Sequence, residues 1–195
     1  MKIWSNSFKD GAAIPGEYAF APSANKNPHL AWAEVPSGTA SLVLLCIDGD
    51  APTDGTNVNK KGSTLPASMP RADFFHWSLI DIPTTRSSIA AGEFSQDVTP
   101  KGKPATLQAP LRHGINDYTS WFAGDPDMAG DYHGYDGPCP PWNDERTHHY
   151  VFRLYALDIP RLELEGRFTC QDVLQAMHGH ILDEAQVIGS YSLFE

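Results

Sequence analysis

The apolar run at residues 42–47, Leu-Val-Leu-Leu-Cys-Ile, limits the fold more than any other feature of the sequence. It is continuous, so an extended segment would be apolar on both faces, and it is too short for a typical buried helix. It leads directly into a polar turn at residues 48–52, Asp-Gly-Asp-Ala-Pro. This pattern predicts a strand that is buried on both faces and ends in a loop.

Residues 74–82 predict a second strand, which Pro83 ends. A period of two places His76 on the same side of this strand as Ser78 and Ile80.

Residues 148–157 predict a third strand, which is central because both of its faces are largely apolar. His148 shares one face with Tyr150, whereas His149 is in the opposite phase and is expected to point away.

One helix is predicted near the end of the chain. Thr169 has the position of an N-cap, with Asp172 three residues later. The helical spacing that follows is carried by Val173, Leu174, Met177, Ile181 and Leu182. The pattern therefore predicts a helix that ends near Asp183, followed by a short final strand at residues 186–193.

Turns and loops fill most of the remaining chain. The 16 glycines and 16 prolines argue against a long-helix bundle, and residues 54–72 and 92–142 carry many turn signals. Several strands, one main helix and long loops predict a mostly β protein, an antiparallel β-sandwich. The length of 195 residues suits a single domain, residues 1–195.

Composition excludes several classes of partner. The formal net charge is −10 and the isoelectric point is about 5.1, so nucleic acid is not an expected partner. No apolar stretch approaches the roughly 20 residues that span a bilayer, and the N-terminus has no apolar signal core. Three cysteines without a CxxC pair fit a reducing compartment, so the expected location is the cytoplasm.

Three polar elements lie where binding groups usually gather, at strand ends and in the loops after them. They are the pair Asp48 and Asp50, the strand residue His76, and the loop at residues 134–141. Each has a purely structural alternative: a turn-forming pair of carboxylates, a core histidine, and a rigid proline loop. These alternatives stay open at the level of the individual motifs.

Taken together, the motifs resemble a known family. Residues 134–141 read Gly-Tyr-Asp-Gly-Pro-Cys-Pro-Pro, and residues 148–158 read His-His-Tyr-Val-Phe-Arg-Leu-Tyr-Ala-Leu-Asp. Together they are similar to the signature of the phosphatidylethanolamine-binding protein family, which includes Raf kinase inhibitor protein and bacterial relatives. Residues 48–52 resemble its Asp-Pro-Asp-Ala-Pro motif, with Gly49 in place of proline. Further resemblances lie at residues 27–32, 75–83, 114–118 and 188–191, in the family's order.

The resemblance implies a β-sandwich with a small pocket at one end that accepts anionic, phosphate-like groups. It places these ligand-binding residues in the pocket: Asp48, Asp50, Pro52, His76, Tyr135, Gly137, Pro138, Pro140, Pro141, His148 and Tyr150. No catalytic residue, cofactor or metal is expected from it.

The chemistry of such a pocket can be argued from the residue types. Imidazoles of His76 and His148, the Tyr150 hydroxyl and backbone N–H groups near Gly137 are the expected donors to a phosphate oxygen. A carboxylate would repel phosphate, so Asp48 is expected to orient a histidine and raise its pKa. The alternative is that the carboxylates accept a hydrogen bond from a ligand ammonium.

Two segments are long for a bacterial-type member of the family, residues 53–73 and 119–132. We expect them to form a rim or lid at the pocket mouth, or an interface in a homodimer. Their structural alternative is tolerated surface insertion.

The expected function is binding of a small phosphorylated or anionic ligand, with a regulatory role. An alternative is a protein target, with the chain acting as an inhibitor of a kinase or protease through protein–protein contacts. A metal-dependent hydrolase using Asp48, Asp50, His76 and His148 is less favoured, because these residues lie far apart in sequence. An enzyme is therefore not the expected class.

Overall fold

The computed structural model describes residues 1–20 and 24–194, whose strands form two antiparallel sheets. The larger sheet has the strand order β6-β4-β3-β7-β8. Its strands are β3 (Ser41–Pro52), β4 (Arg71–Ile82), β6 (Arg112–His113), β7 (His148–Leu157) and β8 (Ile181–Tyr191). The smaller sheet has the order β1-β2-β5, formed by β1 (Lys2–Trp4), β2 (Leu30–Ala33) and β5 (Ser88–Ile89). The mostly β, antiparallel sandwich predicted from the sequence is confirmed.

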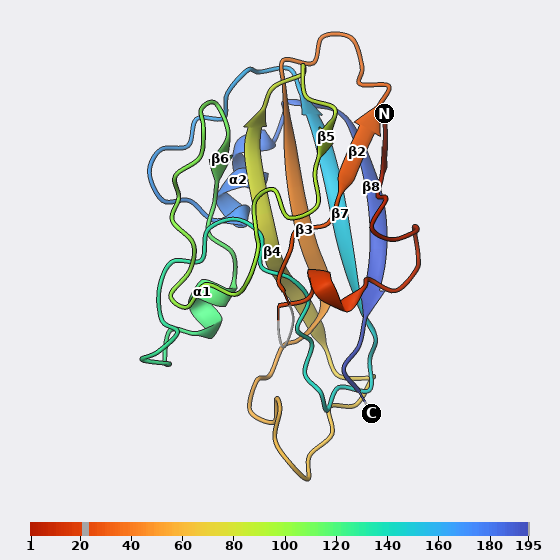
Figure 1. Ribbon diagram of the computed structural model, residues 1–195, viewed down its shortest axis with the longest axis vertical. Coiled ribbons are helices and arrows are strands. Elements are labelled where there is room, and N and C mark those ends of the chain that lie inside the picture. The colour runs from red at the N-terminus through yellow and green to blue at the C-terminus, as the bar shows by residue number, and fades with distance from the viewer. Residues whose placement is uncertain (21–23, 195) are drawn as a thin grey trace.

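Three layers lie on top of one another (Figure 1): the small sheet in front, the large sheet in the middle, and the helix α2 (Cys170–Met177) behind. One apolar core lies between the two sheets and a second lies between the large sheet and α2. Two shorter helical turns, η1 (Gly16–Tyr18) and α1 (Tyr118–Trp121), lie in the loops.

Strand β3 passes between both cores, as the continuous apolar run predicts. Leu42 and Leu44 pack in the core between the sheets, whereas Val43 and Leu45 pack against the α2 side. All four are fully buried. A strand without a solvent face therefore needs no polar residue until Asp48, where the cores end.

Strand β7 follows the predicted alternation. Tyr150 and Phe152 face the core between the sheets, and Tyr155 and Leu157 face α2. At the start of the strand His148 is buried while the His149 side chain is exposed, so the two histidines point in opposite directions as predicted.

Strand β4 does not keep a period of two, and the expectation that His76 shares a face with Ser78 and Ile80 is wrong. Cys46 of β3 pairs with Trp77, but the next residue of β3 pairs with Phe75. His76 is thus the extra residue of a β-bulge, which re-aims one side chain. Its ring lies 5.1 Å from that of Tyr150, which faces the core between the sheets. Ile80 instead packs on the α2 side.

The helix α2 begins where the sequence predicts but ends earlier. Thr169 and Asp172 form a reciprocal capping box, in which each side chain accepts a hydrogen bond from the backbone N–H of the other residue. The helix ends at Met177, because the chain turns at Gly179, whose φ of 86° suits glycine. Ile181, predicted as helical, starts β8 instead.

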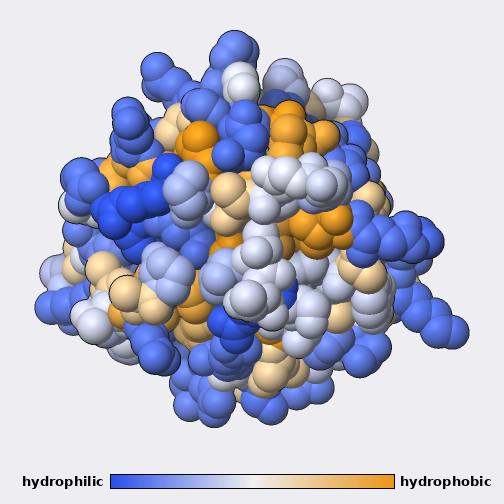
Figure 2. Space-filling view, turned by 90° about the horizontal axis from the view of Figure 1, so that it is seen from above, coloured by the Kyte–Doolittle hydropathy of each residue, from blue (hydrophilic) through white to orange (hydrophobic). Residues whose placement is uncertain are grey.

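The end of the sandwich at which β3 begins is shown in Figure 2. Hydrophilic residues surround smaller hydrophobic areas on this face. Ile181 and Leu182, at the same end, are 44% and 45% exposed. Among the helices that the structure describes, none is long and apolar enough to cross a bilayer.

Candidate ligand-binding site

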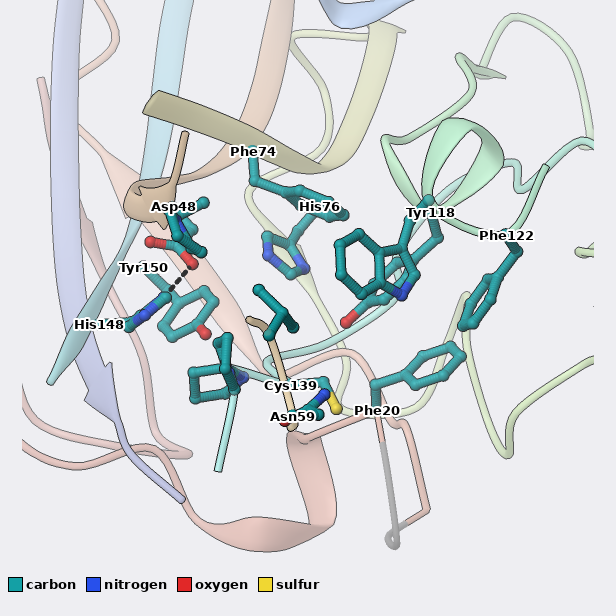
Figure 3. Close-up of a pocket in the computed structure, with 16 residues that line it drawn as sticks. Phe20, Asp48, Asn59, Phe74, His76, Tyr118, Phe122, Cys139, His148 and Tyr150 are labelled. Atoms are coloured by element: carbon teal, nitrogen blue, oxygen red, sulfur yellow. Dashed lines mark hydrogen bonds and ion pairs between the residues drawn. The ribbon is translucent and has the colours of Figure 1, made fainter. Parts of the chain in front are cut away.

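A cavity of about 370 Å³ lies at the end of the sandwich where β3 passes into the loop before β4 (Figure 3). This volume is within the range of small-molecule pockets. Its walls are Phe20, Asp48, Ala51, Pro52, Val58, Asn59, Phe74, His76, Tyr118, Trp121, Phe122, Cys139, Pro140, Pro141, His148 and Tyr150. The wall is largely aromatic and prolyl, with a few polar groups from β3, β4 and β7.

The structure brings together seven of the eleven residues predicted for the pocket: Asp48, Pro52, His76, Pro140, Pro141, His148 and Tyr150. The other four, Asp50, Tyr135, Gly137 and Pro138, do not line the cavity. The role of the seven in binding a ligand stays a prediction.

Sequence reasoning missed Phe20, Phe74 and Tyr118 in the aromatic part of the wall, whereas Trp121 and Phe122 belong to the 119–132 segment expected at the pocket mouth. Phe74 lies two residues before His76 in the same predicted strand, so its place could have been inferred. The others come from loops that have no periodic pattern.

Asp48 and His148 form a buried ion pair in the cavity wall. The Asp48 carboxylate accepts a hydrogen bond of 2.6 Å from Nδ1 of His148, marked by the dashed line in Figure 3. Nε2 of the same ring lies 3.1 Å from the Asp144 carboxylate. Burial opposes a charge on His148, but the two carboxylates outweigh it and raise the pKa of the imidazole. The Asp48 carboxylate is thus in position to orient the His148 ring, and its role in ligand binding stays a prediction.

His148 has no N–H left for a ligand, contrary to the sequence-based expectation that its imidazole is a donor to phosphate. Both ring nitrogens are within hydrogen-bonding distance of carboxylates, Asp48 on one side and Asp144 on the other. His148 lines the cavity with both of its nitrogens already bonded to carboxylates.

Arg71 completes this charged group behind the wall. Its guanidinium binds Asp144 through two hydrogen bonds, of 2.5 and 3.0 Å, and also donates to the Asp50 carbonyl. The side chains of Arg71 and Asp144 are 8% and 0% exposed. With His148 protonated, the formal charges of Asp48, His148, Asp144 and Arg71 sum to zero, so this side of the cavity has no net charge.

Asp50 turns away from the cavity. Its carboxylate accepts hydrogen bonds of 2.6 Å from Arg146 and 2.8 Å from the ring of His149. Burial acts to raise the pKa of Asp50, but these two partners hold it below its usual range. The Asp50 N–H donates to Asp48, at 2.8 Å. The expected turn at residues 48–52 is wrong, because β3 continues to Pro52 and its pairing with β4 only shifts register between Asp48 and Ala51.

His76 reaches the cavity as a neutral imidazole. Burial lowers the pKa of this ring, and the nearby carboxylates, Asp48 first, only partly oppose it. Nδ1 lies 2.7 Å from the carbonyl oxygen of Asp136, which can only accept, so Nδ1 carries the hydrogen. Nε2 is left as an acceptor with no hydrogen-bond partner among residues 1–20 and 24–194.

The Tyr150 hydroxyl is buried without a hydrogen-bond partner in the part of the chain that the structure describes. The residue is fully buried and lines the cavity, next to the His76 ring. Burial raises the pKa of this phenol well above its usual 10, and the charge of Asp48 acts in the same direction. The hydroxyl therefore keeps its proton and can donate a hydrogen bond to an acceptor on a ligand.

The proline loop is held from behind by the predicted residues that do not line the cavity. The Tyr135 hydroxyl donates to the Tyr18 carbonyl at 2.7 Å, and the Gly137 N–H donates to Asn25 at 2.8 Å. The Pro138 carbonyl accepts from the Phe20 N–H at 2.9 Å. Gly137 has room only for hydrogen, since a Cβ there would stand 2.1 Å from the Tyr18 oxygen. These residues position the loop that carries Pro140 and Pro141.

Both long segments contribute to the cavity wall. Val58 and Asn59 come from the 53–73 segment, and Trp121 and Phe122 from the 119–132 segment. The two segments also meet each other, because a Cβ built on Gly55 would lie 3.9 Å from the indole of Trp121. The expected rim at the pocket mouth is thus present.

No group of three or more histidine, cysteine, aspartate or glutamate side chains with metal-binding geometry exists among the described residues. Asp50 faces away from the other candidates, and both nitrogens of His148 are already bonded to carboxylates. The donor set proposed for a metal-dependent hydrolase is therefore not assembled.

A two-sheet sandwich with an aromatic cavity at one end, in which a histidine and a tyrosine keep unused polar groups, defines a class of small-ligand-binding β proteins. Comparison with known proteins identifies the family. Residues 4–192 match the model of the phosphatidylethanolamine-binding protein family, so the chain belongs to it.

Relatives match over almost the full chain. A UPF0098 protein of Aquifex aeolicus is 32% identical over 191 residues, which cover 98% of this chain and 88% of that protein. The UPF0098 protein YbhB of Escherichia coli is 29% identical and is covered over its whole length, with 98% of this chain. The crystal structure of Escherichia coli YbcL, described as a new member of the mammalian PEBP family, has the same fold, with a TM-score of 0.73 at 22% identity. That match covers 98% of this chain and 97% of YbcL.

Proposed function

We propose that this protein binds a small ligand through a phosphate group in the cavity between β3, β4 and β7. The observation that carries the proposal is the Tyr150 hydroxyl, a buried donor without a partner among the described residues. Such a group costs about 1–3 kcal/mol while it is unsatisfied, so an acceptor oxygen of a ligand would recover that free energy.

His76 supplies the second contact, and it brings a proton into the binding reaction. Nε2 of the neutral ring has a lone pair, which a phosphate oxygen can approach only with a hydrogen between the two atoms. A phosphate monoester has a second pKa near about 6, so the shared proton is available near neutral pH. Binding of the dianion therefore takes up about one proton.

Because the charges in the cavity wall are paired, they would not repel an anionic ligand. Asp48 alone would repel phosphate, but its carboxylate is paired with His148 at 2.6 Å. Asp144 is likewise paired with Arg71. The family's name, phosphatidylethanolamine-binding protein, supports a ligand with a phosphate group.

Calorimetric titration with inorganic phosphate tests the proposal. At about pH 8, run in two buffers of different ionisation enthalpy, the wild type is expected to bind phosphate with uptake of close to one proton. His76→Asn places an amide where Nδ1 donates to Asp136 but removes Nε2, so affinity and proton uptake both fall. Tyr150→Phe weakens binding about tenfold, the loss of one hydrogen bond to a charged group.

Protein stability separates a binding role of Tyr150 from a structural one. Because the hydroxyl is unpartnered within the described chain, Tyr150→Phe is expected to leave the free energy of unfolding unchanged or to raise it. Absence of phosphate binding by the wild type, or binding without proton uptake, contradicts the proposal.

We also propose that the protein works in the cytoplasm, without turnover of its ligand. The buried thiols of Cys46 and Cys170 suit a reducing compartment. Burial raises the pKa of Cys170 to about 12, so this thiol is not a nucleophile at neutral pH.

A further inference from the structure

The cavity has two unlike halves, and the proposed phosphate contacts use only one of them. His76 and Tyr150 lie at the β-sheet side, beside the Asp48–His148 pair. The opposite side, toward Trp121 and the 53–73 segment, has a mostly aromatic lining, to which Asn59 adds a polar side chain. A phosphate alone would leave this second half unfilled.

Aromatic rings build the second half as a continuous wall. The ring centroids of Phe20 and Tyr118 are 4.4 Å apart and those of Tyr118 and Phe122 are 5.6 Å apart, with interplanar angles of 16° and 15°. Figure 3 shows Tyr118, Phe122 and Phe20 on the side of the cavity away from Asp48 and His148. Val58, from the other long segment, adds an aliphatic surface.

Trp121 closes this half at the mouth. The indole lines the cavity yet is 50% exposed, and it lies against Gly55 of the facing segment. A large apolar side chain that is half in water regains hydrophobic free energy when a ligand covers it. Trp121 thus lies at the point where a substituent on a bound phosphate would extend toward the cavity mouth.

Charge argues against an ammonium group in this place. The one carboxylate in the cavity wall, among the described residues, is that of Asp48, and it is paired with His148. A cation entering the aromatic half would be attracted to the ring faces but would meet no unpaired anion, so its lost hydration would be offset only in part. An uncharged apolar group loses no such hydration.

We propose, on the basis of the phosphate-binding function above, that the preferred ligand is a phosphate monoester with an apolar, ring-sized substituent. Trp121 is the residue that selects this substituent. The segments 53–73 and 119–132 thereby determine specificity, while the sheet side of the cavity provides the phosphate contact.

Affinities for inorganic phosphate, phosphoethanolamine and phenyl phosphate test this inference in the full-length protein. Phenyl phosphate is expected to bind about tenfold more tightly than either of the others, since one aromatic contact and its buried area are worth that ratio. Trp121→Ala is expected to lower the affinity for phenyl phosphate to that for inorganic phosphate, measured for the same variant. Trp121→Phe, which keeps a ring, retains part of the preference.

Trp4→Ala is the matched control, because Trp4 is 43% exposed and does not line the cavity. This variant is expected to keep the full preference for phenyl phosphate. Phosphate binding without any preference for phenyl phosphate, or tighter binding of phosphoethanolamine, overturns the inference but leaves the proposed function intact. A preference that survives in Trp121→Ala overturns the role of Trp121. Failure of all three probes to bind overturns the proposed function itself.

Discussion

At the level of single residues, the pocket depends on partners that neutralise one another. His148 lies between two carboxylates, and its raised pKa means that the folded state holds a proton more tightly than the unfolded chain. Stability from this group is fully present below the unfolded pKa and is lost as the pH rises through the folded one.

Asp48→Asn is expected to lower the free energy of unfolding by about 3 kcal/mol near pH 6, because it breaks a buried pair. It also reduces the loss of stability on the alkaline side, since the pKa of His148 falls toward its ordinary value. Urea unfolding at pH values from about 6 to 9 measures both effects. The amide oxygen of the substituted side chain can still accept the hydrogen bond from the Asp50 N–H, so this local contact within β3 is retained.

Asp50→Asn provides the comparison for this prediction. Asp50 is bonded to Arg146 and His149 rather than to His148. Asp50→Asn should therefore leave unchanged the loss of stability that the wild type shows as the pH rises. Identical pH profiles for Asp48→Asn and the wild type would show that His148 is not charged in the folded protein.

At the level of elements, the start of α2 was readable from sequence but its end was not. The capping box needs only local contacts between Thr169 and Asp172, which their spacing reveals. The apolar spacing continues past Met177 to Ile181, and only the turn at Gly179 and the pairing of β8 with β7 stop the helix. Pairing with a distant strand overrides a local pattern.

Thr169→Ala is expected to destabilise the protein by about 1 kcal/mol, because it removes the side-chain acceptor of the N-cap. Thr169→Ser keeps the hydroxyl and should be close to the wild type. Gln171→Ala, at an exposed position in the same turn, serves as the control and should cost nothing measurable. Chemical denaturation of the four proteins, including the wild type, decides the matter; equal midpoints would show that the cap adds no stability.

The strands also combine features that a local pattern predicts with features that depend on pairing between distant segments. The runs that form β3 and β7 are predictable because their faces are decided by burial, residue by residue. The bulge at His76 is invisible in the sequence of β4, since it arises from the pairing of Trp77 and Phe75 with consecutive residues of β3. The face of His76 could therefore not be predicted from periodicity.

At the level of the whole molecule, buried neutral histidines set the response to acid. Burial lowers the pKa of His113 to about 3, with the charge of Lys103 acting in the same direction, and Nε2 accepts a hydrogen bond of 3.2 Å from Trp77. At pH values below the pKa that His113 has in the unfolded chain, the unfolded chain binds a proton at this residue and the folded protein does not. The free energy of unfolding therefore falls as the pH falls. The slope is about 1.4 kcal/mol per pH unit for this one group.

His113→Gln is expected to flatten the acid side of the stability profile by that slope while it keeps an acceptor for Trp77. His76, whose pKa is also lowered, still titrates, so part of the acid dependence remains. Denaturation in urea at intervals between about pH 7 and pH 4 gives the slopes. Parallel profiles for the variant and the wild type would mean that His113 is not the group responsible.

The candidate site could be predicted only in part, and the reason is geometric. Asp48 and His76 stand out in the sequence because binding groups gather at strand ends, whereas His148 is placed in the pocket by the resemblance to the family. Phe20, Phe122 and Val58 come from irregular loops, whose paths depend on the complete tertiary structure.

The bulge in β4 has a consequence for how such a protein can change. A single inserted residue rotates one imidazole into the chamber, while Trp77 and Leu79 stay packed against the opposite sheet. The side chain proposed to contact the ligand is therefore separate from the side chains that hold the two sheets together, so ligand choice can drift in evolution with little penalty for folding.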